Sequence, residues 1–255
     1  MGKTIKKMLG IALIMMLTLA MLPVSSFAEQ GVMQPEDYKV ISKLKGSKSW
    51  LGGQITGTVD VSPTVSVKPL QLMKDSDTIY RGEINGVVES ADLFKVAYDL
   101  YKNTYEKMTT PFGDIKNLVM FDENGKYPVA TYTVTFSDNI TVDVNNVIAT
   151  ENTETISKIE KEVSEHSVKF TFYLGNWNDY KGFFDLVASE QNKKGHEINI
   201  SVPYTVDSSK VSEGVVGQIK GSGKCLLIKS GGRFSGRKIV NITSPENTIN
   251  INLAR

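Results

Sequence analysis

Cysteine is nearly absent from this chain of 255 residues, in which Cys225 is the only one. A single thiol excludes an intrachain disulfide, so the fold must be stabilised by side-chain packing. Cys225 lies between Lys224 and a pair of leucines, and this setting favours a buried cysteine over a reactive nucleophile.

Histidine is also scarce, since His166 and His196 are the only two. With one cysteine and two distant histidines, no zinc site of the usual spacing can be drawn. The motifs His-Glu-X-X-His and Gly-X-Ser-X-Gly are both missing. We therefore predict no catalytic residue, no metal and no cofactor. The enzymatic alternative is a secreted hydrolase that acts through two carboxylates. Candidates for such a pair are Glu83, Glu89, Asp92, Asp179 and Asp185.

The first 28 residues have the pattern of a secretory signal peptide. Three lysines within the first seven residues precede an apolar run from Met8 to Leu22, which ends at Pro23 and is followed by small residues. The run is shorter than the ~20 residues that span a bilayer. We predict cleavage after Ala28 and a secreted protein that is released or held at a surface non-covalently.

The charge of the remaining chain is close to balanced. The full chain has 29 basic and 28 acidic residues, and residues 1–28 contain three lysines and no acid. Removing them leaves 26 basic and 28 acidic residues, a net charge of −2. Since nucleic-acid affinity depends on neutralising phosphates, this balance argues against a nucleic-acid partner. Nothing in the sequence defines an oligomeric state.

Residues 129–150 contain the clearest secondary-structure signal. Apolar residues alternate with threonines up to Phe136, and alternation resumes at Ile140 after Ser137-Asp138-Asn139. This period of two, with β-branched and aromatic residues, predicts strands with one buried face. A three-residue loop at 137–139 would place Phe136 opposite Ile140 and keep the apolar faces together, so we predict a β-hairpin.

The rest of the chain predicts an α+β fold that is mostly β, with antiparallel sheets and two or three packed helices. We predict a flexible leader over residues 29–36 and one globular region over 37–255, with an internal boundary near 150–166 as an alternative. A weak similarity between residues 80–94 and 173–184 suggests two similar strand–helix–strand units. Apolar spacing of three and four predicts helices over 91–108, capped by Ser90, over 153–165, and from the Asp179 cap onward. In the third helix the residues expected to point inward are Tyr180, Phe183, Phe184 and Val187. Further strands are predicted over 38–44, 54–61, 64–67, 115–121, 167–174, 197–206 and within 215–253, and residues 78–88 are predicted to form a strand pair or a bent strand.

The C-terminal region contains a long segment without acids. Between Glu213 and Glu246 there are six basic residues and seven glycines. A cationic surface in a near-neutral protein attracts anions, although lysines on edge strands also serve to block unwanted strand pairing. Exposed aromatics can stack on sugars, and Trp177 lies in a predicted loop. The candidate ligand-binding residues are Lys220, Lys224, Lys229, Arg233, Arg237, Lys238 and Trp177.

These features favour an exported, non-catalytic bacterial protein that binds an anionic or carbohydrate polymer of a cell envelope or extracellular matrix. Membrane contact is not favoured. The alternative that involves a membrane is a pore-forming toxin that inserts the 129–150 hairpin, because its arms have the length and alternation of membrane-spanning strands.

Overall fold

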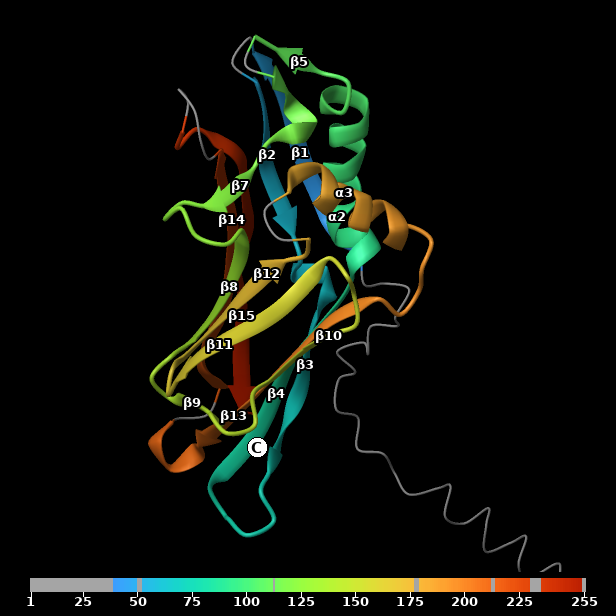
Figure 1. Cartoon of the computed structure of the whole chain (residues 1–255). Helices are drawn as coiled ribbons and strands as arrows, with labels where there is room; N and C mark the ends of the chain where they lie inside the picture. Colours follow the sequence, from blue (N-terminus) through green and yellow to red (C-terminus); the bar gives the residue numbers. More distant parts are fainter. Residues whose placement is uncertain are drawn as a thin grey trace, which may run out of the picture. The chain divides into compact units, whose positions relative to one another are not determined.

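The computed structural model describes residues 39–49, 52–111, 113–176, 179–211, 214–229 and 235–253. Two β-sheets and two α-helices dominate these residues, so the predicted mostly β, antiparallel fold is confirmed, with two helices (Figure 1). The helices are α2 (Ser90–Leu100), which continues as a π-helical turn to Tyr105, and α3 (Tyr180–Glu190).

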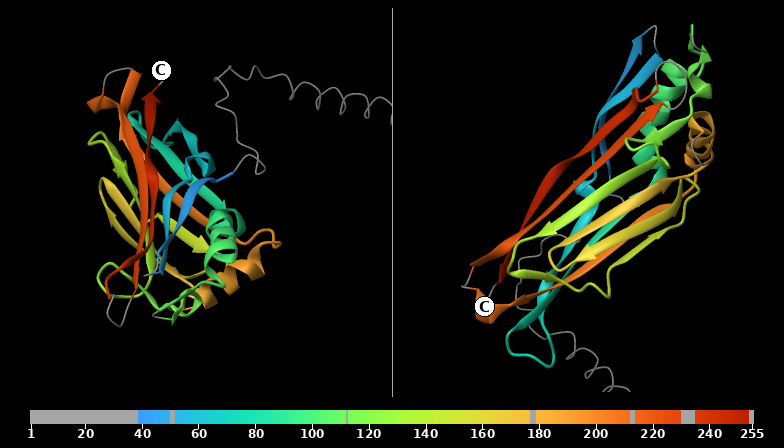
Figure 2. Two further views of the ribbon diagram at one scale, coloured as in Figure 1. Left: turned by 90° about the horizontal axis from the view of Figure 1, so that it is seen from above. Right: turned by 60° about the vertical axis from the view of Figure 1, so that its left-hand side comes forward.

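The large sheet contains eight strands. In spatial order they are β1 (Ile41–Ser49), β2 (Gly52–Asp60), β15 (Lys238–Leu253), β14 (Gly214–Lys229), β8 (Val129–Phe136), β12 (Ser167–Leu174) and β11 (Ile156–Ser164), while β7 (Met120–Asp122) pairs with one end of β14. The pairing of β15 with β2 is parallel, and the other pairings between described strands are antiparallel. The long β14–β15 hairpin runs through the middle of this sheet (Figure 2).

The second sheet has five strands. It is built from β10 (Ile148–Glu151), β13 (Glu197–Asp207), β4 (Ile79–Glu89) and β3 (Val65–Leu72), with β9 (Ile140–Val142) paired to β13. A two-stranded ribbon joins β5 (Thr109–Thr110) to β6 (Gly113–Asp114), and short 3-10 turns span Ser62–Thr64, Ile115–Asn117 and Ser208–Lys210. Thr78 to Val88, predicted as a strand pair or a bent strand, is therefore one strand.

The two sheets bury their facing side chains in a shared core. One cluster combines Val134 and Phe170 of the large sheet with Val202 and Tyr204 of the second sheet. A second cluster contains the helices, whose aromatic rings pack directly on one another. Tyr101 stacks on Phe184 with ring centroids 4.4 Å apart. The inward aromatics predicted for the third helix are therefore buried, as expected.

The predicted hairpin at 129–150 is wrong in its pairing, although its strands exist. Strand β8 pairs with β12 and β14 in the large sheet, and β9 pairs with β13 in the second sheet. The residues between them cross from one sheet to the other, with a tight turn from Ser137 to Ile140. The membrane-inserting hairpin of the pore-former alternative is therefore not a unit of this fold.

The helix predicted over 153–165 is also wrong, because these residues form strand β11. A bulge between Ile156 and Lys158 shifts the strand by one residue. It brings Ile156, Ile159 and Val163 to the inward face, at the spacing that resembled a helix. The strands that precede the two helices, β4 and β12, lie in different sheets.

Capping differs between the two helices. Asp179 caps α3, as predicted, because its carboxylate accepts a hydrogen bond from the Gly182 amide at 3.1 Å. Ser90, expected to cap α2, is instead its first residue, and its hydroxyl pairs with that of Thr155 at 2.7 Å.

Candidate functional site

The predicted basic residues do not gather at one point. Lys220 and Lys224 lie on the solvent face of β14, whereas Lys229, Arg237 and Lys238 lie at the far end of the β14–β15 hairpin. Lys220 and Lys229 are nine positions apart along β14, which corresponds to roughly 30 Å. Arg233 and Trp177 lie outside the described residues.

Acids from other parts of the chain neutralise part of this basic segment. The ammonium group of Lys224 lies 2.6 Å from a carboxylate oxygen of Glu123, and that of Lys220 lies 3.2 Å from Glu246. Both lysines are about half exposed, so the pairs are solvated and weak. The surface is therefore less cationic than the run of residues without acids suggested.

The glycines of this segment have a packing role. A Cβ atom at Gly221 would lie 2.3 Å from the Tyr132 hydroxyl, and one at Gly223 would lie 2.9 Å from the same ring. Tyr132 of β8 thus packs beneath β14 because two of its neighbours lack side chains. Burial raises the pKa of Tyr132 to about 12.

Strand register creates a continuous polar row on the outer face of the large sheet. Directly paired residues on adjacent strands point to the same face, and here they follow one another across seven strands. From β1 to β11 the row is Lys43, Thr58, Thr243, Lys224, Thr131, Thr171 and Glu160. None of these residues is buried. At about 4.8 Å per strand, the row spans roughly 29 Å.

A polar pocket of about 270 Å³ lies on this face, beside the centre of the row. Its floor includes Thr131, Thr171 and Lys224, and its wall is the turn after β7. The Asp122 side chain shapes that turn by accepting hydrogen bonds from the backbone amides of Asn124 at 3.0 Å and Lys126 at 2.6 Å.

Two tyrosines form the aromatic part of the pocket. The rings of Tyr127 and Tyr173 are 5.6 Å apart at an angle of 52°. The Tyr173 hydroxyl donates to Glu160 at 2.7 Å, and this hydrogen bond raises the pKa of Tyr173. The ammonium group of Lys158 lies 5.4 Å from the centre of the Tyr173 ring. Aromatic rings, hydroxyls and charged groups therefore converge here.

Sequence reasoning found Lys224 but missed the other groups of the pocket. Thr131 and Thr171 alternate with apolar residues on their strands, and this signal placed them correctly on a polar face. Which strands lie side by side, and therefore that Tyr173 meets the turn after β7, depends on the sheet order.

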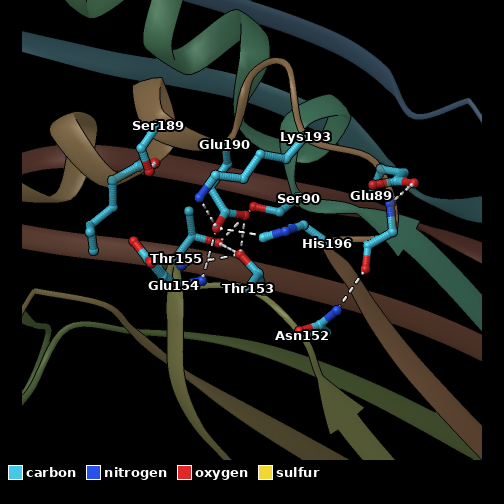
Figure 3. Close-up of polar contacts among 12 residues, drawn as sticks. Glu89, Ser90, Asn152, Thr153, Glu154, Thr155, Ser189, Glu190, Lys193 and His196 are labelled. Carbon is cyan, nitrogen blue, oxygen red and sulfur yellow. Dashed lines mark hydrogen bonds and ion pairs between the residues drawn. The ribbon is translucent and has the colours of Figure 1, made fainter.

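A separate buried polar cluster joins the two helices to the second sheet (Figure 3). At its centre is Glu190, which is fully buried at the end of α3. Its carboxylate accepts hydrogen bonds from the Thr153 hydroxyl at 2.5 Å and the Glu154 amide at 3.1 Å, and His196 Nδ1 lies 3.1 Å away. Burial acts to raise the pKa of Glu190, but these hydrogen bonds outweigh it and hold the pKa below its ordinary value.

This cluster fits a structural role. Glu190 is fully buried, so a ligand cannot reach its carboxylate. The other histidine, His166, is not part of this cluster, because it lies at the β11–β12 turn with its Nδ1 3.0 Å from the Ile140 carbonyl oxygen. Four of the five carboxylates suggested for a hydrolase pair also have partners. Glu83 accepts from Lys68 and Ser201, Glu89 from the Gly195 amide, Asp179 caps α3 and Asp185 pairs with Lys181.

Neither a metal-binding group nor a membrane span is found in the part of the chain that the structure describes. There, no three histidine, cysteine, aspartate or glutamate side chains gather in a way that would hold a metal ion. No described helix combines the length and the apolar composition needed to cross a membrane. The predicted signal peptide lies outside the described residues.

Comparison with known proteins gives matches among solved structures alone. No protein-family model and no curated protein matches this chain. Similar structures include the collagen-binding subdomain of the Enterococcus faecalis surface protein ACE, with 9% identity and a TM-score of 0.32 over 75% of this chain and 97% of that one. A collagen-binding domain from a Staphylococcus aureus adhesin has 8% identity and a TM-score of 0.28 over 73% and 97%.

The T6 backbone pilin of Streptococcus pyogenes has 10% identity and a TM-score of 0.36 over 74% of this chain and 35% of that one. These three matched proteins are surface adhesins and a pilin of bacteria. At such identities and TM-scores, the matches do not assign a ligand to this chain.

Proposed function

We propose that this chain is an exported, non-catalytic binding protein whose outer sheet face binds a carbohydrate polymer of a cell envelope or extracellular matrix. The binding surface is the polar row through Lys224 together with the pocket beside Tyr173. The observation that carries this proposal is the convergence of two tyrosine rings with hydroxyls and charged groups in one solvent-facing depression.

The chemistry of the pocket suits a sugar. Sugar hydroxyls need both donors and acceptors, and threonine hydroxyls supply both while lysine donates and glutamate accepts. The faces of tyrosine rings offer apolar area with a polar edge, which matches the mixed apolar and polar surface of a pyranose ring. Thr131, Thr171 and Tyr173 bring these groups together on two paired strands.

The length of the row favours a polymer over a single sugar. The pocket lies beside the centre of the proposed surface, and the polar row extends past it in both directions to a total length of roughly 29 Å. Polar side chains on a rigid sheet need little reorganisation to bind an extended chain.

A neutral or weakly charged carbohydrate fits better than a strongly anionic polymer. The lining includes three lysines and two acids. Of these lysines, Lys224 pairs with Glu123, and Lys169 pairs with Glu162 at 2.6 Å. A polyanion would have to displace these acids, whereas sugar hydroxyls can hydrogen-bond to the existing ion pairs.

The test is binding of the purified protein to neutral glucan, purified cell-wall polysaccharide and an anionic glycosaminoglycan. Calorimetry at two salt concentrations measures the affinity. We expect binding to an uncharged polysaccharide that changes little with salt and weakens at least tenfold in Tyr173→Ala and Thr171→Ala. The matched control is Lys68→Ala, which breaks a comparable exposed lysine–glutamate pair on the second sheet and should bind normally.

The anionic alternative makes a different prediction. If the ligand is a polyanion, the affinity falls steeply with salt, and changing Lys224, Lys229, Arg233 and Arg237 to alanine abolishes binding. Unchanged polysaccharide binding by Tyr173→Ala and Thr171→Ala would contradict the proposed surface.

A further inference from the structure

An apolar cavity of about 180 Å³ lies between the two sheets, on the side of β8 and β14 opposite to the polar pocket. Its lining comes from three layers of the fold. Phe172 and Cys225 belong to the large sheet, Val88 and Ile200 to the second sheet, and Phe94 to α2.

The cavity lies at the junction of the two hydrophobic clusters. Phe94 and Cys225 pack on the edge of the helix-side cluster, Ile200 packs on the edge of the sheet-side cluster, and Phe172 contacts both. All four side chains face the space between the sheets, yet each stays partly accessible to solvent. The two clusters therefore do not close against each other at this point.

This space opens toward solvent, because several of its lining side chains are partly accessible, and it is larger than the voids found in most cores. Native cores contain few voids larger than a water molecule. An engineered apolar cavity of about 150 Å³ stays dry and binds benzene. The cavity described here is somewhat larger and is lined mainly by aliphatic and aromatic side chains.

The polar groups of the lining are few and uncharged on the cavity side. Thr64 is buried and its hydroxyl donates to the Val61 carbonyl oxygen at 2.8 Å, so it is already satisfied. The Lys224 ammonium group pairs with Glu123 on the outer face. Burial raises the pKa of the Cys225 thiol to about 12, so the thiol stays protonated. A charged group would find no partner inside.

We propose that this cavity is a binding site for an uncharged apolar group the size of one aromatic ring. The ligand is a small molecule that carries a phenyl or short branched alkyl group, held between Phe94, Phe172 and Ile200. This site is separate from the polysaccharide surface and does not depend on it.

Benzene is the probe for the first test. Thermal unfolding is followed with and without benzene, and carbon-13 methyl NMR follows Val88 and Ile200. A free benzene concentration of ten times its Kd should raise Tm by roughly 3–6 °C. The methyl signals of the lining should shift, whereas those of Val168, buried outside the cavity, should stay in place.

Substitutions that fill the cavity distinguish a loss of benzene binding from a loss of folding. Ala130 of β8 and Ala97 of α2 both line the cavity, so Ala130→Leu and Ala97→Leu add bulk inside it. We expect at least one variant to fold with an unchanged or higher Tm and to lose the benzene-induced shift. Ala149→Leu adds the same bulk on β10, outside the lining, and should keep that shift in the folded protein.

Labelling of Cys225 provides a readout that is independent of stability. Benzene should slow the reaction of Cys225 with methyl methanethiosulfonate at least fivefold at a saturating concentration. Absence of both a Tm rise and methyl shifts in the wild type would overturn the proposal. So would a full benzene response in well-folded Ala130→Leu and Ala97→Leu proteins.

Discussion

The replacement Glu190→Ala is the sharpest test of how the helices are fixed to the sheets. Glu190 is completely buried, and its two carboxylate oxygens serve Thr153, the Glu154 amide and His196. These partners come from the segment between β10 and β11 and from the start of β13. The carboxylate therefore joins the end of α3 to two strand connections.

The cost of this replacement follows from the donors that it leaves unpaired. The Thr153 hydroxyl and the Glu154 amide, which are both part-buried, lose this acceptor, and each group left unsatisfied costs up to about 1–3 kcal/mol. A small cavity adds to this cost. We expect a loss of about 3–5 kcal/mol in the free energy of unfolding, which lowers Tm by roughly 8–15 °C for a protein of this size.

The assay is thermal and urea unfolding followed by circular dichroism at pH 7. Asp185→Ala is the matched control, because Asp185 is on the same helix and forms an exposed ion pair with Lys181. Its removal should change the unfolding free energy by less than about 1 kcal/mol. Equal Tm values for Glu190→Ala and Asp185→Ala would refute the assigned role of the buried cluster.

Three further predictions concern pH, packing and the thiol. The folded-state pKa of Glu190 lies below its ordinary value of 4.5, so the carboxylate's contribution to stability is present above pH 4.5 and is lost as the pH falls through the folded pKa. In Glu190→Gln, which has no carboxylate to protonate, the urea midpoint should therefore depend less on pH in the acid range. Gly82→Ala places a Cβ 2.4 Å from the buried Tyr204 ring and should destabilise by about 1–3 kcal/mol in urea unfolding; an unchanged midpoint would mean that the ring yields freely. Cys225 should react with an anionic aromatic disulfide reagent at least 100-fold more slowly in native protein than in urea, because burial raises its pKa to about 12, and equal rates would show an open thiol.

Much of the local structure could be predicted from the sequence. Alternation in β8, β12 and β13 reports a buried face directly, because successive side chains of a strand point to opposite sides. The apolar spacing in α2 and the Asp179 cap of α3 are equally local signals.

Strand partners could not be predicted in the same way. Phe136 and Ile140 both face a core, and a local hairpin satisfies that pattern as well as a crossing between sheets. In β11 the bulge after Ile156 reproduces helical spacing within a strand. Lys161 lies on the inward side of this edge strand and hydrogen-bonds to the Val147 carbonyl oxygen. Because this inward position is charged, the sequence of β11 lacks the apolar alternation that would have indicated a strand.

In the candidate site, too, local features could be predicted from the sequence, whereas contacts between distant segments could not. Lys224 was identified from the basic segment, but its partner Glu123 comes from the distant turn after β7. The pocket needs Thr131, Thr171 and Tyr173 on adjacent strands, and that adjacency is a property of sheet order. Local patterns therefore placed side chains on the outer face without revealing which of them meet.

Methyl NMR of the threonines during titration with a soluble polysaccharide tests the central proposal most directly. We expect shifts that concentrate at Thr131, Thr171 and Thr243, on the outer face of the large sheet, and that are lost in Tyr173→Ala. Shifts confined to the basic end of the β14–β15 hairpin, or to the second sheet, would contradict it.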